Sequence, residues 1–429
     1  MGTVSWTFLP AAEYEPKPAD VYFEKFNLRK APAPGPLLLK AGDRLAIVGD
    51  SITEQKKYSC LIETYLTVCV PDLKITARQY GWSGETAVGF LKRMKQDCLR
   101  FNPTVATLGY GMNDAKYRPY DDVNGEWYRE NYTAIVKEFK AAGARVVLGS
   151  PGMCTKVASW VKSRTGTLDE LNLNLGTLRD IDIGIAEREG VRFADVFWPM
   201  FKAQFEGQRL YGQNPEQPFF MAGKDGVHPD WAGQLVMAYA FLRAMGLDGQ
   251  IGTVTVDLSA GKATATSGHT VENVANQTIT LTSTRYPFCA TGATNLDSSI
   301  RSGMTLVPFN KELNRLLLIA TKATAAQYQV TWGTQSRVYT AAELADGVNL
   351  ADDFPENPFY EAFKKVEAAV LTKQTYETEQ IKKIFHGPEG KTNMVAAVAR
   401  TEAVRAPLAD AIPSAMMPVK HVIEIKPLP

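Results

Sequence analysis

The sequence predicts an α/β protein whose main domain is a three-layer α/β/α arrangement around a parallel sheet. Short apolar runs alternate with segments of helical periodicity over residues 41–249. Strands buried on both faces read as continuous apolar runs, and the helices between them form the covering layers. After residue 249, β-branched and alternating runs separated by Gly, Asn and Ser predict a C-terminal β-rich, sandwich-like module, followed by a helical segment.

Five apolar runs are expected to form the parallel sheet, at 45–48, 73–77, 105–108, 146–148 and 191–196. Helices are expected over 58–68, 86–99, 130–142, 168–189 and 231–245. In the longest of them, Leu168, Leu171, Leu175 and Leu178 recur at the spacing of one helix face. Because parallel strands end at the same edge of a sheet, residues that follow different strands can meet in one cleft there.

Composition divides the chain into four regions. Residues 1–40 include the Pro-rich stretch Ala31 to Pro36 and predict an extended arm, and residues 41–249 form the α/β domain. Residues 250–350 form the β-rich module, and residues 351–429 a helical segment and tail. Strands of the module are expected at 253–257, 278–282, 316–320 and 328–332, a helix at 359–385, and a late strand at 422–425 in an Ala- and Pro-rich tail.

Size and charge exclude several classes of function. The chain of 429 residues is long enough for two or three domains, and its 47 basic residues nearly balance 46 acidic ones. No global field would therefore recruit nucleic acid or an anionic membrane. No uncharged apolar stretch approaches the roughly 18 residues needed to cross a bilayer. We expect a soluble protein with no nucleic-acid partner and no membrane span.

The cysteines and the N-terminus leave the compartment open. The five cysteines form no C-x-x-C pair, and buried free thiols are expected. The N-terminus lacks the basic segment and apolar core of a signal peptide. The protein is therefore either cytosolic or, if a leader has been cleaved, secreted or periplasmic.

Ser51 lies where the first strand ends and a helix begins, in the segment Gly49-Asp50-Ser51-Ile52. Unpaired N–H groups and the dipole at the start of a helix favour negative charge, so an oxyanion beside Ser51 would find donors aimed at it. The same serine, followed three residues later by Glu54, also fits a capping box. Ser51 is thus a candidate nucleophile, with helix capping as its alternative role.

Four blocks in order along the chain resemble those of the SGNH/GDSL hydrolases. They place Ser51 in G-D-S, Gly84 in S-G-E-T, Asn113 in G-M-N-D and His228 in D-G-V-H-P. The resemblance covers the α/β domain. It implies a serine esterase with Ser51, Asp225 and His228 as catalytic residues. It also implies an oxyanion hole made by the N–H groups of Ser51 and Gly84 and the side-chain amide of Asn113.

The residue types fit these roles. A serine hydroxyl needs a neutral imidazole within hydrogen-bond reach, and His228 alone of four histidines follows an aspartate by three residues and precedes a helix of the α/β domain. Asp225 can fold back to accept the Nδ1–H and fix the tautomer, with a turn as its alternative role. Gly84 lets substrate approach the backbone, although a plain turn also explains it. Asn113 has helix capping as its alternative.

Other chemistries lack their signatures. The G-x-S-x-G elbow and the Walker A loop are absent, and no His or Cys spacing resembles a metal site. We therefore expect neither a metal nor a cofactor. Trp82, Tyr110, Met112 and Trp231 flank the motif residues and are candidates for substrate binding, either by stacking on sugar rings or by lining an acyl pocket. Core packing is their alternative role.

The expected reaction is hydrolysis of short acyl esters, foremost acetyl esters, of a small molecule or polysaccharide through an acyl-enzyme. The β-rich appendage favours a carbohydrate substrate, and so does the resemblance, because members of that family frequently act on decorated polysaccharides. A lipase or thioesterase of the same fold and a non-catalytic carbohydrate-binding or scaffold protein are the alternatives. The oligomeric state stays open.

Overall fold

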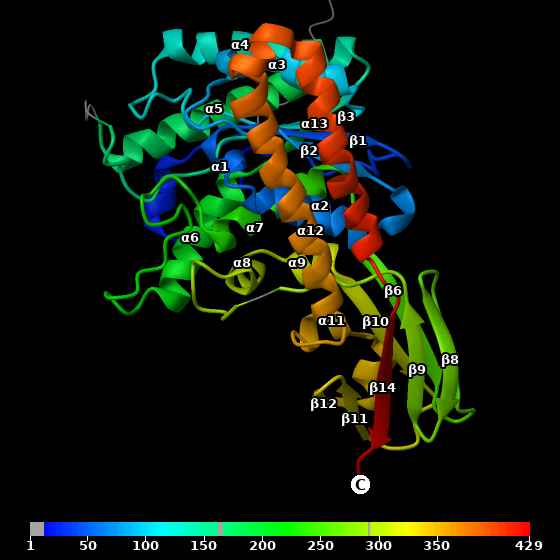
Figure 1. Cartoon of the computed structure of the whole chain (residues 1–429). Coiled ribbons are helices and arrows are strands. Elements are labelled where there is room, and N and C mark those ends of the chain that lie inside the picture. The colour runs from blue at the N-terminus through cyan, green and yellow to red at the C-terminus, as the bar shows by residue number, and fades with distance from the viewer. Residues whose placement is uncertain (1–12, 162–165, 291) are drawn as a thin grey trace, which may run out of the picture.

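A large α/β domain lies above a smaller β-rich module, and a pair of long helices connects the two (Figure 1). This computed structural model describes residues 13–161, 166–290 and 292–429.

The α/β domain is built around a five-stranded parallel sheet, which confirms the predicted fold class. The strand order is β2-β1-β3-β4-β5. The strands are β1 (Arg44–Gly49), β2 (Thr76–Gln79), β3 (Val105–Gly109), β4 (Arg145–Gly149) and β5 (Arg192–Ala194). The register aligns Gly49 with Gly109 and Gly109 with Gly149. The carboxyl ends of three strands therefore lie along one edge, where the sequence placed the candidate site.

Helices cover both faces of this sheet. They are α1 (Ser51–Glu54), α2 (Lys57–Val68), α3 (Ala87–Asp97), α4 (Asp122–Ala141), α5 (Leu168–Glu189), α6 (Phe197–Tyr211) and α7 (Trp231–Ala244). Helix α2 packs against α7, whereas α3, α4 and α5 pack in series. Helix α5 has the predicted bounds because a Thr167–Glu170 capping box begins it and Gly190 ends it. Helix α4 begins earlier than predicted because Asp121 caps it.

Two sheets form the β-rich module. A mixed sheet has the order β13-β10-β6-β7, and an antiparallel sheet has the order β12-β11-β14-β9-β8. The strands are β6 (Gln250–Asp257), β7 (Lys262–Ala265), β8 (His269–Ala275), β9 (Thr278–Ser283), β10 (Arg315–Thr321), β11 (Gln327–Trp332), β12 (Gln335–Thr340), β13 (Val348–Asn349) and β14 (Val419–Pro427). Short helices join them: α8 (Ile300–Leu306), α9 (Phe309–Leu313), α10 (Ala341–Asp346) and α11 (Leu350–Asp353).

The C-terminal hairpin is formed by residues 360–415. Its first helix runs from the β-rich module along the α/β domain, and its second helix runs back to the module (Figure 1). The hairpin consists of α12 (Tyr360–Glu379), a π-helical turn (Gln380–Phe385) and α13 (Pro388–Ala415). Helix α13 occupies the part of the chain that the sequence placed in a tail, and it contains Pro407 and Pro413. After it, β14 pairs with β9 and β11 in the middle of the antiparallel sheet.

The arm before the first strand packs on the α/β domain. Residues Val21–Lys25 form a short 3₁₀ helix that Asp20 caps. Phe23 and Phe26 are buried, and both rings contact Phe201 of α6. The arm is thus held by an aromatic cluster, although the sequence showed only an extended stretch.

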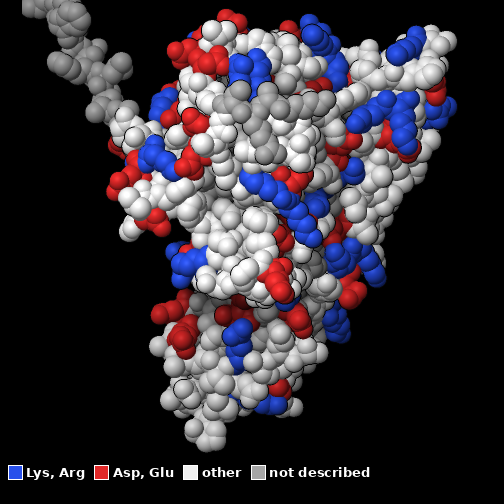
Figure 2. Space-filling model, turned by 90° about the vertical axis from the view of Figure 1, so that its left-hand side faces the viewer, with Lys and Arg blue, Asp and Glu red and all other residues white. Residues whose placement is uncertain are grey.

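The cysteines and the surface agree with the composition. All five cysteines are buried free thiols, as predicted. Basic and acidic side chains are interspersed over the face in Figure 2, as a nearly balanced charge suggests. None of the described helices has the length and apolar character needed to cross a lipid bilayer.

Candidate active site

Three polar side chains form a hydrogen-bonded chain at the carboxyl edge of the parallel sheet. Ser51 Oγ lies 2.7 Å from His228 Nε2, and His228 Nδ1 lies 2.7 Å from Asp225 Oδ2. Ser51 comes from the first turn after β1, whereas the other two come from the loop before α7. Residues 177 positions apart in the chain therefore meet within hydrogen-bond distance.

The partners of Asp225 fix the protonation of this chain. Its Oδ1 accepts from the backbone N–H groups of Val227 and His228, both at 2.9 Å. Burial alone would raise the pKa of Asp225, but these N–H groups and the imidazole lower it below its usual value. An ionised carboxylate only accepts, so the His228 Nδ1 beside it carries a proton. In the neutral imidazole, Nε2 is then the nitrogen that can accept the hydroxyl proton of Ser51.

The turn between Asp225 and His228 requires glycine. Gly226 has a φ of +86°, and a Cβ there would lie 2.3–2.8 Å from atoms of Lys156. The adjacent Thr155 N–H donates to the Gly226 carbonyl at 3.0 Å. The loop after β4 thus packs tightly on the turn that presents the imidazole.

Ser51 begins helix α1 but does not cap it. The N-cap residue is Asp50, whose carboxylate accepts from Ile52 N–H at 2.9 Å. Glu54 points elsewhere, to Ser83 N–H and Lys382. The capping box that the sequence allowed is therefore absent, and the Ser51 hydroxyl faces His228. Burial raises the pKa of Asp50 to about 7.

The loops that carry Gly84 and Asn113 are tied to the start of α1. Asn113 Nδ2 donates to the Glu85 carbonyl at 3.0 Å and lies 3.4 Å from Asp50 Oδ2. Tyr117 O–H donates to Asn113 Oδ1 at 3.1 Å, which turns the amide nitrogen toward these partners. Gly84 is exposed, has a φ of +75° and has open space where a Cβ would stand. Substrate can therefore reach its backbone.

A network of buried polar side chains holds the loops that carry Gly84 and Asn113. Asp114 accepts from Ala87 N–H at 2.9 Å and Gly111 N–H at 3.1 Å, so it caps α3 from a neighbouring loop. Glu85 accepts from Arg93 and from Tyr110 O–H, each at 2.6 Å. The loops beside Ser51 are thus held by side chains that are themselves buried.

The structure places the four predicted substrate-binding residues in two kinds of environment. Tyr110 and Met112 are 1% and 2% exposed, so they belong to the core and present no surface to a ligand. This corrects their predicted role, because the chain turns their side chains into the network described above and toward Cys154. Trp82 and Trp231 are half-buried.

Trp160 is an aromatic neighbour of the site that the sequence did not single out. Its ring lies 5.5 Å from the His228 ring and 6.3 Å from that of Tyr117, and it is 45% exposed. Lys116 and Tyr117 both have positive φ, of 55° and 52°. Two consecutive left-handed residues without glycine are rare and strained, and such strain is often found at functional sites.

This arrangement can activate a hydroxyl for attack on an electrophilic carbon. A serine is a weak nucleophile until a positioned base takes its proton, and the carboxylate behind the base stabilises the imidazolium that forms. The Ser51 N–H at the start of α1 and the exposed backbone at Gly84 are donors of the kind that a developing negative charge requires.

Comparison with known proteins finds similarities to the part of the chain that carries these residues. Residues 47–236 match the model of the GDSL-like lipase/acylhydrolase family. An acetylxylan esterase of Geobacillus stearothermophilus is 24% identical over 232 residues, which are 48% of this chain and 96% of that protein. A solved structure of a catalytic mutant of an acetylxylan esterase from the same organism has a TM-score of 0.40 at 21% identity, covering 49% of this chain and 97% of the other.

The C-terminal region also has a structural counterpart. A gut microbial diltiazem-metabolizing enzyme superposes with a TM-score of 0.71 at 23% identity, covering 92% of this chain and 100% of the other. That likeness shows that the two proteins share an overall fold beyond the α/β domain. Over residues 47–236, this chain is therefore similar to the GDSL-like lipase/acylhydrolase family.

Proposed function

We propose that the chain is a serine esterase that hydrolyses short acyl esters, foremost acetyl esters of carbohydrates, through an acyl-enzyme intermediate. The observation that carries this proposal is the chain of hydrogen bonds from Ser51 through His228 to Asp225, with 2.7 Å at each step. The geometry matches the need of a serine nucleophile for a base and an orienting carboxylate.

The proposed reaction has two halves. Ser51 Oγ attacks the ester carbonyl carbon while its proton passes to His228 Nε2, and the oxyanion is received by the N–H groups of Ser51 and Gly84 and by the Asn113 amide. His228 then protonates the leaving alcohol, which departs and leaves an acyl-serine. Water, deprotonated by the same imidazole, then attacks the acyl carbon. The imidazolium returns this proton to Ser51 Oγ as the acyl–serine bond breaks, which releases the carboxylic acid and restores the serine hydroxyl.

Two observations support the choice of substrate. The matched acetylxylan esterase supports an acetyl group on the acyl side. On the other side, His228 protonates the leaving alcohol, so a ring beside His228 faces the alcohol and not the acyl group. The exposed ring of Trp160, 5.5 Å from His228, is such a surface, and aromatic rings stack on sugar rings.

A substrate panel tests the proposal. We expect the highest kcat/KM for the acetyl member of a p-nitrophenyl ester series from acetyl to decanoyl, and release of acetate from acetylated xylan or acetylated sugars. A preference for decanoyl would instead assign a lipase-type acylhydrolase. Cleavage of p-nitrophenyl acetate with every sugar ester untouched would remove the carbohydrate part of the proposal.

Two variants test the roles of the nucleophile and of the oxyanion donor separately, Ser51→Ala and Asn113→Ala. Ser51→Ala is expected to lower kcat by at least about 10⁴-fold, and Asn113→Ala by about a hundred- to a thousandfold with little change in KM. Full activity of Ser51→Ala would contradict the mechanism, and a wild type without any hydrolytic activity would favour a binding or scaffold role.

A further inference from the structure

Glu54 joins the helix of the candidate nucleophile to the loop that carries Gly84. Its Oε2 accepts from Ser83 N–H at 2.5 Å, and Ser83 directly precedes Gly84. Within the same two segments, Trp82 N–H donates to the Gly49 carbonyl at 3.1 Å. The position of the Gly84 backbone relative to Ser51 therefore depends on where the Glu54 carboxylate is held.

Lys382 holds that carboxylate. Its Nζ donates to both oxygens of Glu54, at 2.8 and 2.9 Å, and both side chains are mostly covered, at 28% and 20% exposure. Burial alone would raise the pKa of Glu54, but the hydrogen bonds from Lys382 and Ser83 outweigh it and lower this pKa. Lys382 lies 328 positions from Glu54 and well outside the segment 47–236 that matches the family.

The turn that carries Lys382 also contacts Trp82. Lys382 Nζ lies 5.1 Å from the centre of the Trp82 ring, and the His386 ring meets Trp82 edge-on at 5.0 Å. His386 Nε2 in turn lies 2.7 Å from Asp97 Oδ2 at the end of α3. Two side chains at the tip of the C-terminal hairpin, Lys382 and His386, thus pack on Trp82 in the loop that leads to Gly84.

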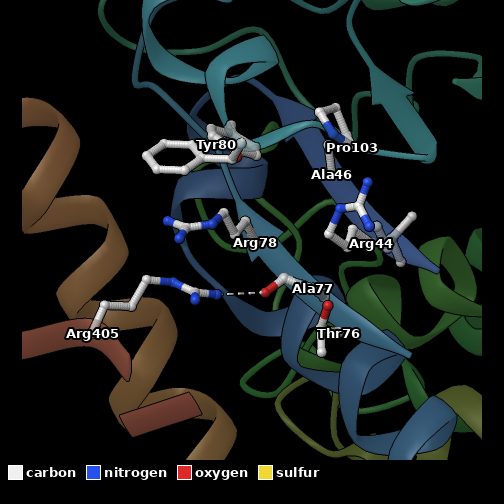
Figure 3. A pocket seen from close by; sticks show the side chains of 10 residues that line it. Arg44, Ala46, Thr76, Ala77, Arg78, Tyr80, Pro103 and Arg405 are labelled. Atoms are coloured by element: carbon white, nitrogen blue, oxygen red, sulfur yellow. Dashed lines mark hydrogen bonds between the residues drawn. The ribbon is translucent and has the colours of Figure 1, made fainter. Parts of the chain in front are cut away.

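The hairpin is anchored on the edge strand of the parallel sheet, so this tip has a fixed place. Glu377 accepts from Gln79 N–H at 3.1 Å, and Arg405 donates to the Ala77 carbonyl at 3.1 Å. Figure 3 shows Arg405 reaching from the hairpin to Ala77. Both residues line a cavity of about 160 Å³. Lys382 itself lies in a π-helical turn, a feature frequently found at functional sites.

We propose that Lys382 is a positioning residue of the active site, which fixes Glu54 and through it the Ser83–Gly84 backbone opposite Ser51. The catalytic role of that backbone rests on the function proposed above. The C-terminal hairpin is then part of the active site of this chain, because it supplies the cation that donates to both oxygens of the Glu54 carboxylate.

Lys382→Met, Lys382→Arg and Lys383→Met test this proposal. Lys383 is the matched control, because it lies on the same turn but is 73% exposed and pairs with Glu379. We expect Lys382→Met to lower kcat by roughly ten- to a hundredfold, with KM changed less than about twofold. Lys382→Arg should recover most of the loss, since a guanidinium can also pair with both carboxylate oxygens. Lys383→Met should behave as the wild type.

Hydrogen–deuterium exchange gives a readout that does not depend on the substrate. The peptide over residues 80–87 should exchange faster in Lys382→Met than in the wild type or Lys383→Met, with exchange in β3 and β4 unchanged. Unchanged exchange and unchanged kcat in Lys382→Met would overturn the proposal, as would an equal loss in Lys383→Met. An inactive wild type with faster exchange in Lys382→Met would contradict only the proposed function.

Discussion

The Ser51 hydroxyl is available to His228 because the neighbouring residue, Asp50, caps the helix that begins at Ser51. The Asp50 carboxylate accepts from the Ile52 N–H in the first turn of α1, so the serine between them has no capping role. Glu54, which could have closed a capping box, is bound by Lys382 and Ser83. The pattern S-x-x-E was compatible with both arrangements, and contacts with distant residues select between them.

Trp160 is expected to bind the alcohol side of the substrate. In Trp160→Ala, kcat/KM for acetylated xylo-oligosaccharides should fall about three- to tenfold, mainly through KM, because a stacked ring is lost. With ethyl acetate, which has no ring, kcat/KM should stay within about twofold of wild type. Steady-state kinetics on the two substrates measures the difference. An equal loss on both would show that Trp160 acts on His228 and not on the substrate.

The polar residues that the sequence singled out lie together in the structure, whereas the aromatic ones do not all lie at the same surface. Ser51, Asp225 and His228 stand in short blocks at strand and helix ends, and the structure brings them into one hydrogen-bonded chain. Tyr110 stands in such a block too, yet it is buried, because position next to a motif does not determine which way a side chain points. Trp160 belongs to no block, so nothing in the sequence linked it to His228.

Among the elements, the strands of the β-rich module are joined by a buried chain of hydrogen bonds. Trp332 Nε1–H donates to His421 Nδ1 at 3.1 Å, and Ser283 Oγ lies 2.9 Å from His421 Nε2 and 2.8 Å from His269 Nδ1. His269 Nε2 lies 3.1 Å from the carbonyl of Ile251. All partners are satisfied when both imidazoles are neutral, since each ring then accepts at one nitrogen and donates at the other.

Acid is expected to destabilise this module. Burial, with a smaller effect of the nearby His269, lowers the pKa of His421 from 6.5 to about 4, and burial lowers that of His269. Between pH 6.5 and 4, these histidines are therefore protonated in the unfolded chain but stay neutral in the folded one. The free energy of unfolding falls as pH drops through this range, by up to about 3 kcal/mol for His421. Urea denaturation across this range measures the effect.

The control for this prediction is His421→Gln, which cannot be protonated there. We expect it to be less stable than wild type at pH 7 but to lose less stability on acidification. An identical slope of stability against pH in both proteins would show that other groups cause the acid sensitivity.

Elements with a local signal were predictable, and those that depend on distant partners were not. Helix α5 has a capping box, a periodic leucine face and a terminal glycine, and its bounds were predicted. Helix α13 was not expected, because Pro407 and Pro413 argue against a helix interior. The strand near residues 422–425 was visible, but its place between β9 and β11 follows from pairing with strands far away in the sequence.

At the scale of the whole molecule, buried charges couple the C-terminal hairpin to the α/β domain. Lys373 of α12 donates to Glu63 of α2 and to the Ala77 carbonyl of β2, both at 2.5 Å, and it lies 3.5 Å from Glu377. Lys373 and Glu63 are 1% and 5% exposed. Removing one member of a buried ion pair leaves the other charge without compensation.

Lys373→Met should therefore lower the free energy of unfolding by about 3–5 kcal/mol. Lys365→Met, at an exposed position of the same helix, should change it by less than about 0.5 kcal/mol. Urea denaturation followed by tryptophan fluorescence compares them. If both variants unfold at the same urea concentration, the hairpin is not coupled to the domain through this pair.

Labelling with a fluorophosphonate, followed by peptide mapping in a mass spectrometer, tests the central claim most directly. A phosphonyl adduct is expected on Ser51 of the wild type and of Ser83→Ala, and its rate of formation should drop at least about a thousandfold in His228→Ala. An adduct on another residue would contradict the account, as would an active wild type that takes no label at Ser51.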